Sequence, residues 1–254
     1  MKALFLTSSL GCSIKLGDAR IPTACDNSNG FIDLLRKEVG DVIKLTIIAS
    51  NPNNVFKTES QAFCLAEGLK FDGFSVDDVA IVDSRFKGDL KDLILSSNVV
   101  FLCGGHVPTQ NNYFKELGLK EVLESYDGVV IGQSAGSMNC STLVYAQPES
   151  EEEFLDSSYN KFIDGLGLTD IIVMPHMNRA KTDTLCGQTT YGMCLEDSYK
   201  CPHYGITDGG YILIKDGKAE AFGRTTYFKD GKEIVLCENG QSITIDGCQE
   251  SNEK

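Results

Sequence analysis

The ten residues Gly128-Val-Val-Ile-Gly-Gln-Ser-Ala-Gly-Ser137 decide the fold of this 254-residue chain. A short apolar run ends in Gly-Gln-Ser-Ala-Gly, and residues that suit a helix follow, which predicts a strand, a very tight turn and a helix. Glycines at 132 and 136 fit such a turn, because side chains there would collide with the adjoining strand and helix. Ser134 is then expected at the apex, with its hydroxyl at the positive N-terminal end of the helix. Taken alone, the pattern also fits a plain strand-to-helix turn.

Strand-like and helix-like patterns alternate on either side of this stretch up to about residue 145. The expected strands are 3–6, 42–49, 79–82, 98–102 and 129–131, and the expected helices are 30–39, 59–69, 90–95 and 111–124. Such alternation is typical of a parallel sheet covered by helices on both faces. Residues 7–29 and the acidic residues Glu151 to Glu153 are expected in loops, 171–174 in a further buried strand, and 178–199 in a loop and a helix.

The pattern changes after residue 200, where five short strand-like runs follow one another. Asp-Gly pairs at 208–209, 216–217 and 230–231 separate several of these runs, which predicts β-hairpins. The sequence therefore predicts one α/β domain over residues 1–247, with the hairpins of 200–240 extending its sheet. Residues 248–254 are expected to form a charged, mobile tail.

Composition narrows the classes of partner. The formal net charge of −13 argues against nucleic acid or an anionic membrane as the main partner. The apolar run at residues 3–6 is shorter than the roughly 7 to 15 residues of a secretion signal, and no stretch approaches the length of a membrane helix. The 10 cysteines include no C-x-x-C pair, so a zinc ribbon and a thioredoxin-like motif have no support, and reduced, mostly buried thiols are expected. These observations predict a cytoplasmic protein.

Gly104-Gly105 follows the expected strand at 98–102. Because the carboxyl ends of parallel strands meet at one edge of the sheet, this loop is expected beside Ser134. Backbone N–H groups of Gly105 and Ala135 could then stabilise an oxyanion. A Gly-Gly turn that binds no ligand is an equally good interpretation of this pair alone.

A nucleophilic serine requires a base, and the chain has three histidines. His176 directly follows the expected strand at 171–174, which places it at the same sheet edge as Ser134. His106 adjoins the Gly104-Gly105 loop and is a candidate substrate contact, whereas His203 is interpreted as structural. For the carboxylate that orients the imidazole, the candidates are Glu149, which lies 15 positions after Ser134 (149 − 134), and Asp170 and Asp183.

Gly104-Gly105, the run from Gly132 to Ser137, and Pro175-His176 resemble, in order and spacing, the S51 serine peptidases. This family includes the aspartyl dipeptidases (dipeptidase E) and the cyanophycinases. The resemblance implies a three-layer α/β sandwich similar to the class I glutamine amidotransferases (flavodoxin-like), with Ser134 as nucleophile and His176 as base. The third residue of the family is an Asp or a Glu at the position of Glu149, which implies a Ser-His-Glu triad. No metal or organic cofactor is implied, and a monomer or a homodimer is compatible with the family.

Two positions depart from the dipeptidases. Gln133 stands before the nucleophile where they carry a Trp, and the segment after His176 lacks their pattern for the arginine that holds an aspartyl carboxylate. Arg179 is the nearest cation, so Gln133, His106 and Arg179 are the candidate substrate contacts.

The expected function is a serine peptidase of small peptides, with dipeptides that begin with Asp among the candidate substrates. The alternatives are a cyanophycinase-like hydrolase, an α/β-hydrolase esterase, an amidotransferase glutaminase and a non-catalytic binding protein on the same scaffold. The long segment after His176 argues against the esterase, and a serine rather than a cysteine at position 134 argues against the glutaminase. The sequence leaves the substrate open.

Overall fold

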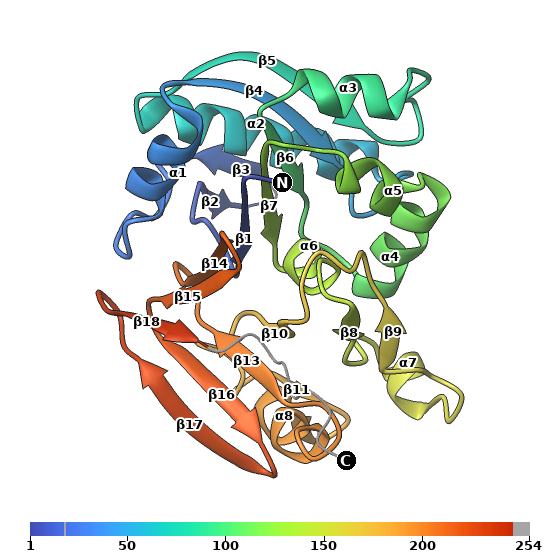
Figure 1. Ribbon diagram of the computed structural model, residues 1–254. Coiled ribbons are helices and arrows are strands. Elements are labelled where there is room, and N and C mark those ends of the chain that lie inside the picture. The colour runs from blue at the N-terminus through green and yellow to red at the C-terminus, as the bar shows by residue number, and fades with distance from the viewer. Residues whose placement is uncertain (18, 246–254) are drawn as a thin grey trace.

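The computed structural model describes residues 1–17 and 19–245, so the tail expected at 248–254 lies outside the described residues. Its centre is an eight-stranded sheet in the order β18-β15-β14-β1-β7-β6-β4-β5 (Figure 1). The parallel strands are β1 (Ala3–Thr7), β4 (Val42–Ile48), β5 (Ser75–Val82), β6 (Val99–Leu102) and β7 (Val129–Gln133). The antiparallel strands are β14 (Tyr211–Lys215), β15 (Lys218–Phe222) and β18 (Ser242–Ile245). The mostly parallel sheet predicted from the sequence is confirmed.

Helices cover both faces of this sheet, because successive strand side chains point to opposite sides. Phe5 of β1 packs with Phe31 and Leu35 of α1 on one face, while Leu4 and Leu6 belong to the core on the other face. The helices of the first face are α1 (Phe31–Val39) and α2 (Val55–Phe71). Those of the second are α3 (Leu90–Ser96), α4 (Val107–Glu116), α5 (Leu119–Glu124) and α6 (Ala135–Met138). The chain thus folds into a three-layer α/β arrangement.

The C-terminal strands are divided between two sheets, which corrects the expectation that they all extend the first one. The second sheet has the order β10 (Val173–Met174), β13 (His203–Ile206), β16 (Thr225–Lys229) and β17 (Lys232–Cys237). Beside it lie the short strands β11 (Thr184–Leu185) and β12 (Gln188–Thr189) and the helix α8 (Thr190–Asp197). Figure 1 shows this sheet as a separate layer beyond the end of β14 and β1.

Two of the three Asp-Gly pairs close hairpins. Asp216-Gly217 joins β14 to β15 and Asp230-Gly231 joins β16 to β17, and all four residues have positive φ, as type I′ turns require. Asp208-Gly209 does not close a hairpin, because β13 and β14 lie in different sheets. This pair instead carries the chain from the second sheet back to the first.

Several local expectations are corrected. The loop expected at 7–29 contains a hairpin, β2 (Ser13–Leu16) and β3 (Ala19–Pro22), which packs against α2. The helix expected at 111–124 begins earlier and is two helices, because Gly118 takes a left-handed conformation with φ 60° between α4 and α5. The expected strand at 171–174 is reduced to the two residues of β10.

The acidic stretch after Pro148 is a helix and not a loop. Ser150 caps the N-terminus of α7 (Glu151–Leu155) by accepting a hydrogen bond from the backbone N–H of Glu153. Three glutamates in the first turn suit the positive end of a helix. The preceding and following segments pair as β8 (Leu143–Tyr145) and β9 (Phe162–Asp164).

Most thiols are in the interior, as expected. Seven of the nine cysteines in the described part of the chain are buried. Across residues 1–17 and 19–245, no helix is both long and apolar enough to cross a membrane.

Candidate active site

Ser134 occupies the sharp turn between β7 and α6. Its backbone angles, φ 53° and ψ −115°, lie in a region that non-glycine residues rarely adopt. A side chain at Gly132 would place its Cβ 2.6 Å from the backbone nitrogen of Ser137, and one at Gly136 would overlap the carbonyl oxygen of Leu102. The steric reason for both glycines is therefore confirmed, and the turn holds the Ser134 hydroxyl at the carboxyl edge of the sheet.

His176 lies two residues beyond β10 and faces this hydroxyl. Its Nε2 is 2.9 Å from Ser134 Oγ. The backbone of His176 is also left-handed, with φ 60°, so the strand end turns sharply to aim the imidazole at the serine. The structure thus brings together the two residues that the sequence analysis paired.

The carboxylate on the other side of His176 belongs to Asp208. Asp208 Oδ1 is 2.6 Å from His176 Nδ1. A carboxylate only accepts hydrogen bonds, so Nδ1 carries the imidazole proton and Nε2 is free to accept from the Ser134 hydroxyl. Burial by itself would raise the pKa of Asp208, but hydrogen bonds from His176 and Ser8 lower that pKa to about 2.

Ser8, directly after β1, holds both partners. Its fully buried hydroxyl donates to Asp208 Oδ1 over 2.7 Å and accepts from the backbone N–H of His176 over 2.8 Å. One side chain therefore fixes both the strained backbone of the histidine and the position of the carboxylate. Ser8 is not recognisable from the sequence, since a serine after a strand has no distinctive signal.

Glu149 does not contact His176, which corrects its expected role. Its Oε1 accepts a hydrogen bond of 3.3 Å from the backbone N–H of Val107, at the start of α4. Burial raises the pKa of this carboxyl. The segment through β8 directs Glu149 toward α4 and not toward the histidine. The competitor Asp183 faces Arg179, with 3.8 Å between Asp183 Oδ2 and Arg179 Nε, and Asp170 is exposed.

The sequence does not single out Asp208, because an Asp-Gly pair is typical of a hairpin turn. A carboxylate two residues beyond a buried strand, and at the same sheet edge as Ser134, was the signal available in the sequence. This signal can be recognised only if the strand at 203–206 is known to pair in parallel with the strand that precedes His176. That pairing is a long-range contact.

The Gly104-Gly105 loop passes close to Ser134, as predicted. A Cβ on Gly104 would lie 3.2 Å from Ser134 Cβ, and one on Gly105 would collide with Ser50. Ala135 is the first residue of α6, so its N–H has no partner within the helix. The geometry leaves the backbone of Gly105 and Ala135 near Ser134, where an oxyanion requires donors.

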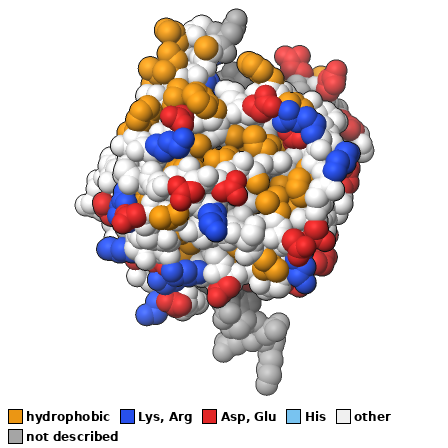
Figure 2. Space-filling view, turned by 90° about the horizontal axis from the view of Figure 1, so that it is seen from above, with side chains coloured by type: hydrophobic (Ala, Val, Ile, Leu, Met, Phe, Trp, Pro, Cys, Tyr) orange, Lys and Arg blue, Asp and Glu red, His pale blue; other side chains and the backbone are white. Residues whose placement is uncertain are grey.

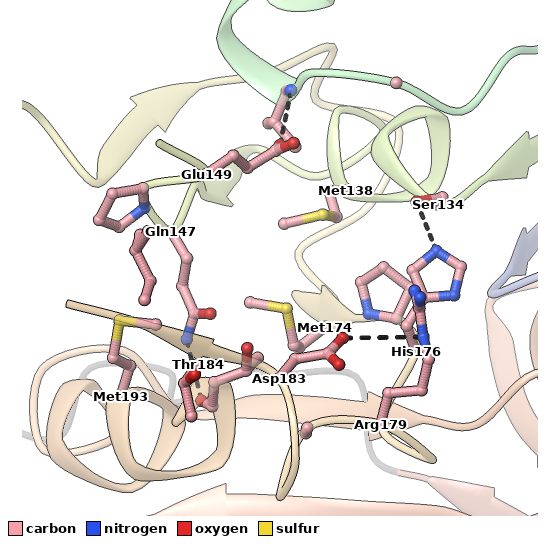
Figure 3. Close-up of a pocket in the computed structure, with 17 residues that line it drawn as sticks. Ser134, Met138, Gln147, Glu149, Met174, His176, Arg179, Asp183, Thr184 and Met193 are labelled. Atoms are coloured by element: carbon pink, nitrogen blue, oxygen red, sulfur yellow. Dashed lines mark hydrogen bonds and ion pairs between the residues drawn. The ribbon is translucent and has the colours of Figure 1, made fainter. Parts of the chain in front are cut away.

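A cavity of about 340 Å³ opens on Ser134 and His176 (Figure 3). Gly105, Glu149 and Arg179 line it. His106 and Gln133 are not among the lining residues: the His106 ring nitrogens contact Thr109 and Glu153 over 2.7 Å each, and the Gln133 amide lies beside Gly104. Of the three candidate substrate contacts, Arg179 alone lines the cavity.

A thiol nucleophile and a metal site are two other chemistries to consider near Ser134. Cys140, the thiol nearest to Ser134 in sequence, is buried two residues after the end of α6. Its thiol donates to the carbonyl of Gly136 over 3.1 Å, and Cys140 is not among the residues that line the cavity. Within residues 1–17 and 19–245, no group of three or more His, Cys, Asp or Glu side chains is arranged to hold a metal ion.

A serine, an imidazole and a carboxylate linked in this order at the edge of an α/β sheet form the arrangement found in many hydrolases. The sequence matches the family described as "Peptidase family S51" over residues 55–222. The chain belongs to this family, and it is a peptidase.

Solved structures show the same fold. A peptidase from an acI-B1 actinobacterium superimposes with a TM-score of 0.65 at 17% identity, covering 96% of this chain and 97% of that one. A candidate peptidase E from Listeria monocytogenes EGD-e gives a TM-score of 0.51 at 18% identity, covering 93% and 98%. No curated protein matches the sequence.

Proposed function

We propose that the protein is a serine-type peptidase that hydrolyses small peptides through Ser134, His176 and Asp208. The observation that carries the proposal is the continuous hydrogen-bonded series from Ser134 Oγ through the imidazole to Asp208 Oδ1. Membership of peptidase family S51 supports the same reaction class.

In the proposed mechanism His176 acts first as a base and then as an acid. Nε2 takes the hydroxyl proton of Ser134 while Oγ attacks the peptide carbonyl carbon, and Asp208 stabilises the imidazolium that forms. The N–H groups of Gly105 and Ala135 stabilise the oxyanion of the tetrahedral intermediate. His176 then protonates the leaving amine, which leaves an acyl group on Ser134.

Water completes the cycle. His176 removes a proton from a water molecule as its oxygen attacks the acyl carbon, and the second tetrahedral intermediate collapses to release the acid and restore the Ser134 hydroxyl. Every step uses groups of this chain and water.

The size of the cavity supports short substrates. At about 340 Å³ it lies near the lower end of the roughly 300–1,000 Å³ of ligand sites. Dipeptides that begin with Asp remain within the proposal, but Arg179, the cation that lines the cavity, faces Asp183 and would have to leave it to hold an acidic group. The further assignment to the class I glutamine amidotransferase-like scaffold is consistent with the order of the parallel strands.

The test is replacement of the nucleophile. We expect Ser134→Ala to lower kcat/KM for a mixed small-peptide substrate by at least about 10³-fold, since the attacking atom is lost. The matched control, Ser125→Ala, removes an exposed hydroxyl that bonds the carbonyl of Val122 and should leave kcat/KM unchanged. Both variants should show the wild-type circular dichroism spectrum. Wild-type turnover by Ser134→Ala would refute the proposed function.

A further inference from the structure

We propose that the cavity beside Ser134 binds a large apolar side chain of the substrate, such as Leu, Met or Phe, adjacent to the scissile bond. This inference rests on the proposed function and specifies its substrate class. It follows from which side chains form the walls of the cavity and from how its charged groups are already engaged.

Three methionines from three different elements form the apolar part of the cavity. Met138 ends α6, Met174 ends β10 and Met193 belongs to α8, and each is at most 6% exposed. Figure 3 shows Met138 between Ser134 and Glu149, and Met174 between His176 and Met193, with Met193 on the side away from Ser134. Unbranched thioether side chains adapt to apolar groups of different shape, so they suit a subsite that accepts several large residues.

The charged groups of the cavity already have partners. Arg179, 56% exposed at its side chain, faces Asp183 across 3.8 Å. Glu149 accepts the backbone N–H of Val107, and burial raises its pKa, which disfavours a charge there. A substrate carboxylate would have to be buried among methionines and compete with Asp183 for Arg179, and burying an unpaired charge is strongly unfavourable.

The position of the cavity relates this side chain to the reacting bond. Ser134 and His176 line the same cavity as the three methionines. A peptide whose carbonyl meets Ser134 Oγ therefore places a neighbouring side chain against the methionines. The apolar walls remove that side chain from water, which increases the affinity for larger residues.

The first experiment measures kcat/KM of the wild-type protein on di- and tripeptides in which each residue flanking the scissile bond is varied in turn. At one flanking position we expect Leu, Met and Phe to exceed Gly by roughly 10- to 100-fold, and Asp by at least as much. The inference would be overturned if Asp or Lys gave the highest kcat/KM at that position. It would also be overturned if kcat/KM did not depend on side-chain size at either flanking position.

The second experiment fills the cavity. Met193→Trp should lower the ratio of kcat/KM for Leu over Gly by roughly 10-fold or more, because the indole occupies the space of the substrate side chain. The matched control is Leu95→Trp on α3, a side chain that is 48% exposed and absent from the cavity lining, and it should keep the wild-type ratio. An unchanged ratio in a folded Met193→Trp protein would contradict the inference.

Reaction of Ser134 with a fluorophosphonate distinguishes failure of the apolar subsite from failure of the proposed serine mechanism. If the protein cleaves peptides with a preference for Asp and Ser134 is labelled, the apolar subsite is overturned and the serine mechanism is retained. No cleavage of any peptide and no labelling of Ser134 would overturn the proposed function, and the subsite with it.

Discussion

At the scale of single residues, the hydrogen bond between His176 and Asp208 determines which imidazole nitrogen carries the proton. With Asp208 on Nδ1, Nε2 has its lone pair directed at Ser134 Oγ. Because hydrogen bonds lower the pKa of Asp208 to about 2, this carboxylate is ionised at neutral and mildly acidic pH. Loss of activity on mild acidification from neutral pH is therefore not expected to come from protonation of Asp208.

Exchange of the carboxylate for an amide tests this assignment. Asp208→Asn should lower kcat/KM by about 10³- to 10⁴-fold, because an amide N–H next to Nδ1 favours the wrong tautomer. Glu149→Gln, a matched carboxylate-to-amide change in the same cavity, should lower kcat/KM by less than about 10-fold, since Gln can still accept from Val107 N–H. The reverse order of the two effects, measured by steady-state kinetics on one peptide, would contradict the triad proposed here.

At the scale of elements, the site depends on three strand ends that Ser8 joins. β1 ends just before Ser8, β10 just before Pro175-His176 and β13 just before Thr207-Asp208, and the Ser8 hydroxyl bonds both His176 and Asp208. The first sheet and the second sheet therefore meet at the proposed triad. Relative displacement of the sheets would break the hydrogen bonds that orient the imidazole.

Ser8→Ala should lower kcat by roughly 10- to 100-fold, in line with the loss of a hydrogen bond to a charged group, about 1.5–3 kcal/mol. KM should change little, because Ser8 is not among the residues that line the cavity. Wild-type kcat in this variant would show that Ser8 does not position the pair.

Elements with local signals were predictable from the sequence, and those that depend on long-range pairing were not. The strand-turn-helix at Ser134 follows from its glycines, and β4 and α1 follow from their periodicity. In contrast, the division of the C-terminal strands between two sheets depends on the pairing of β10 with β13, about 30 residues apart in the chain.

The same reason explains the partial prediction of the site. Ser134, His176 and the Gly104-Gly105 loop lie at strand ends that the alternating pattern revealed. Asp208 lies on a turn whose local signal, Asp-Gly, is typical of a hairpin. Its role becomes visible only when the second sheet brings it to His176.

At the scale of the whole molecule, one apolar core connects the second sheet to the first. Leu4 and Val130 of the first sheet and Phe228 of the second belong to the same cluster of buried residues. His203 lies beside this core with no exposed surface, stacks on Phe228 with ring centroids 5.2 Å apart, and donates from Nδ1 to the carbonyl of Cys201. Burial lowers the pKa of His203 to about 4.

This histidine predicts a loss of stability in acid. The unfolded chain binds a proton at His203 near the ordinary pKa of about 6.5, whereas the folded state does so only near 4, so the free energy of unfolding falls as pH drops between these values. At about 1.4 kcal/mol per pKa unit, His203 lowers the free energy of unfolding by a few kcal/mol at pH 4 relative to pH 7.

His203→Phe should flatten this dependence. Urea denaturation at several pH values between 7 and 4 measures the free energy of unfolding of both proteins. The quantity to compare is the slope of that free energy against pH, because the variant's stability at pH 7 can differ for reasons of packing. An equally steep fall in the variant would show that other groups cause the acid sensitivity.

The central claim is that His176 activates Ser134 as a nucleophile, and covalent labelling tests it most directly. We expect a fluorophosphonate to modify the protein once, with mass spectrometry placing the adduct on Ser134 and with labelling strongly slowed in His176→Ala. An adduct on another residue, or labelling of Ser134 at the same rate without His176, would contradict the account.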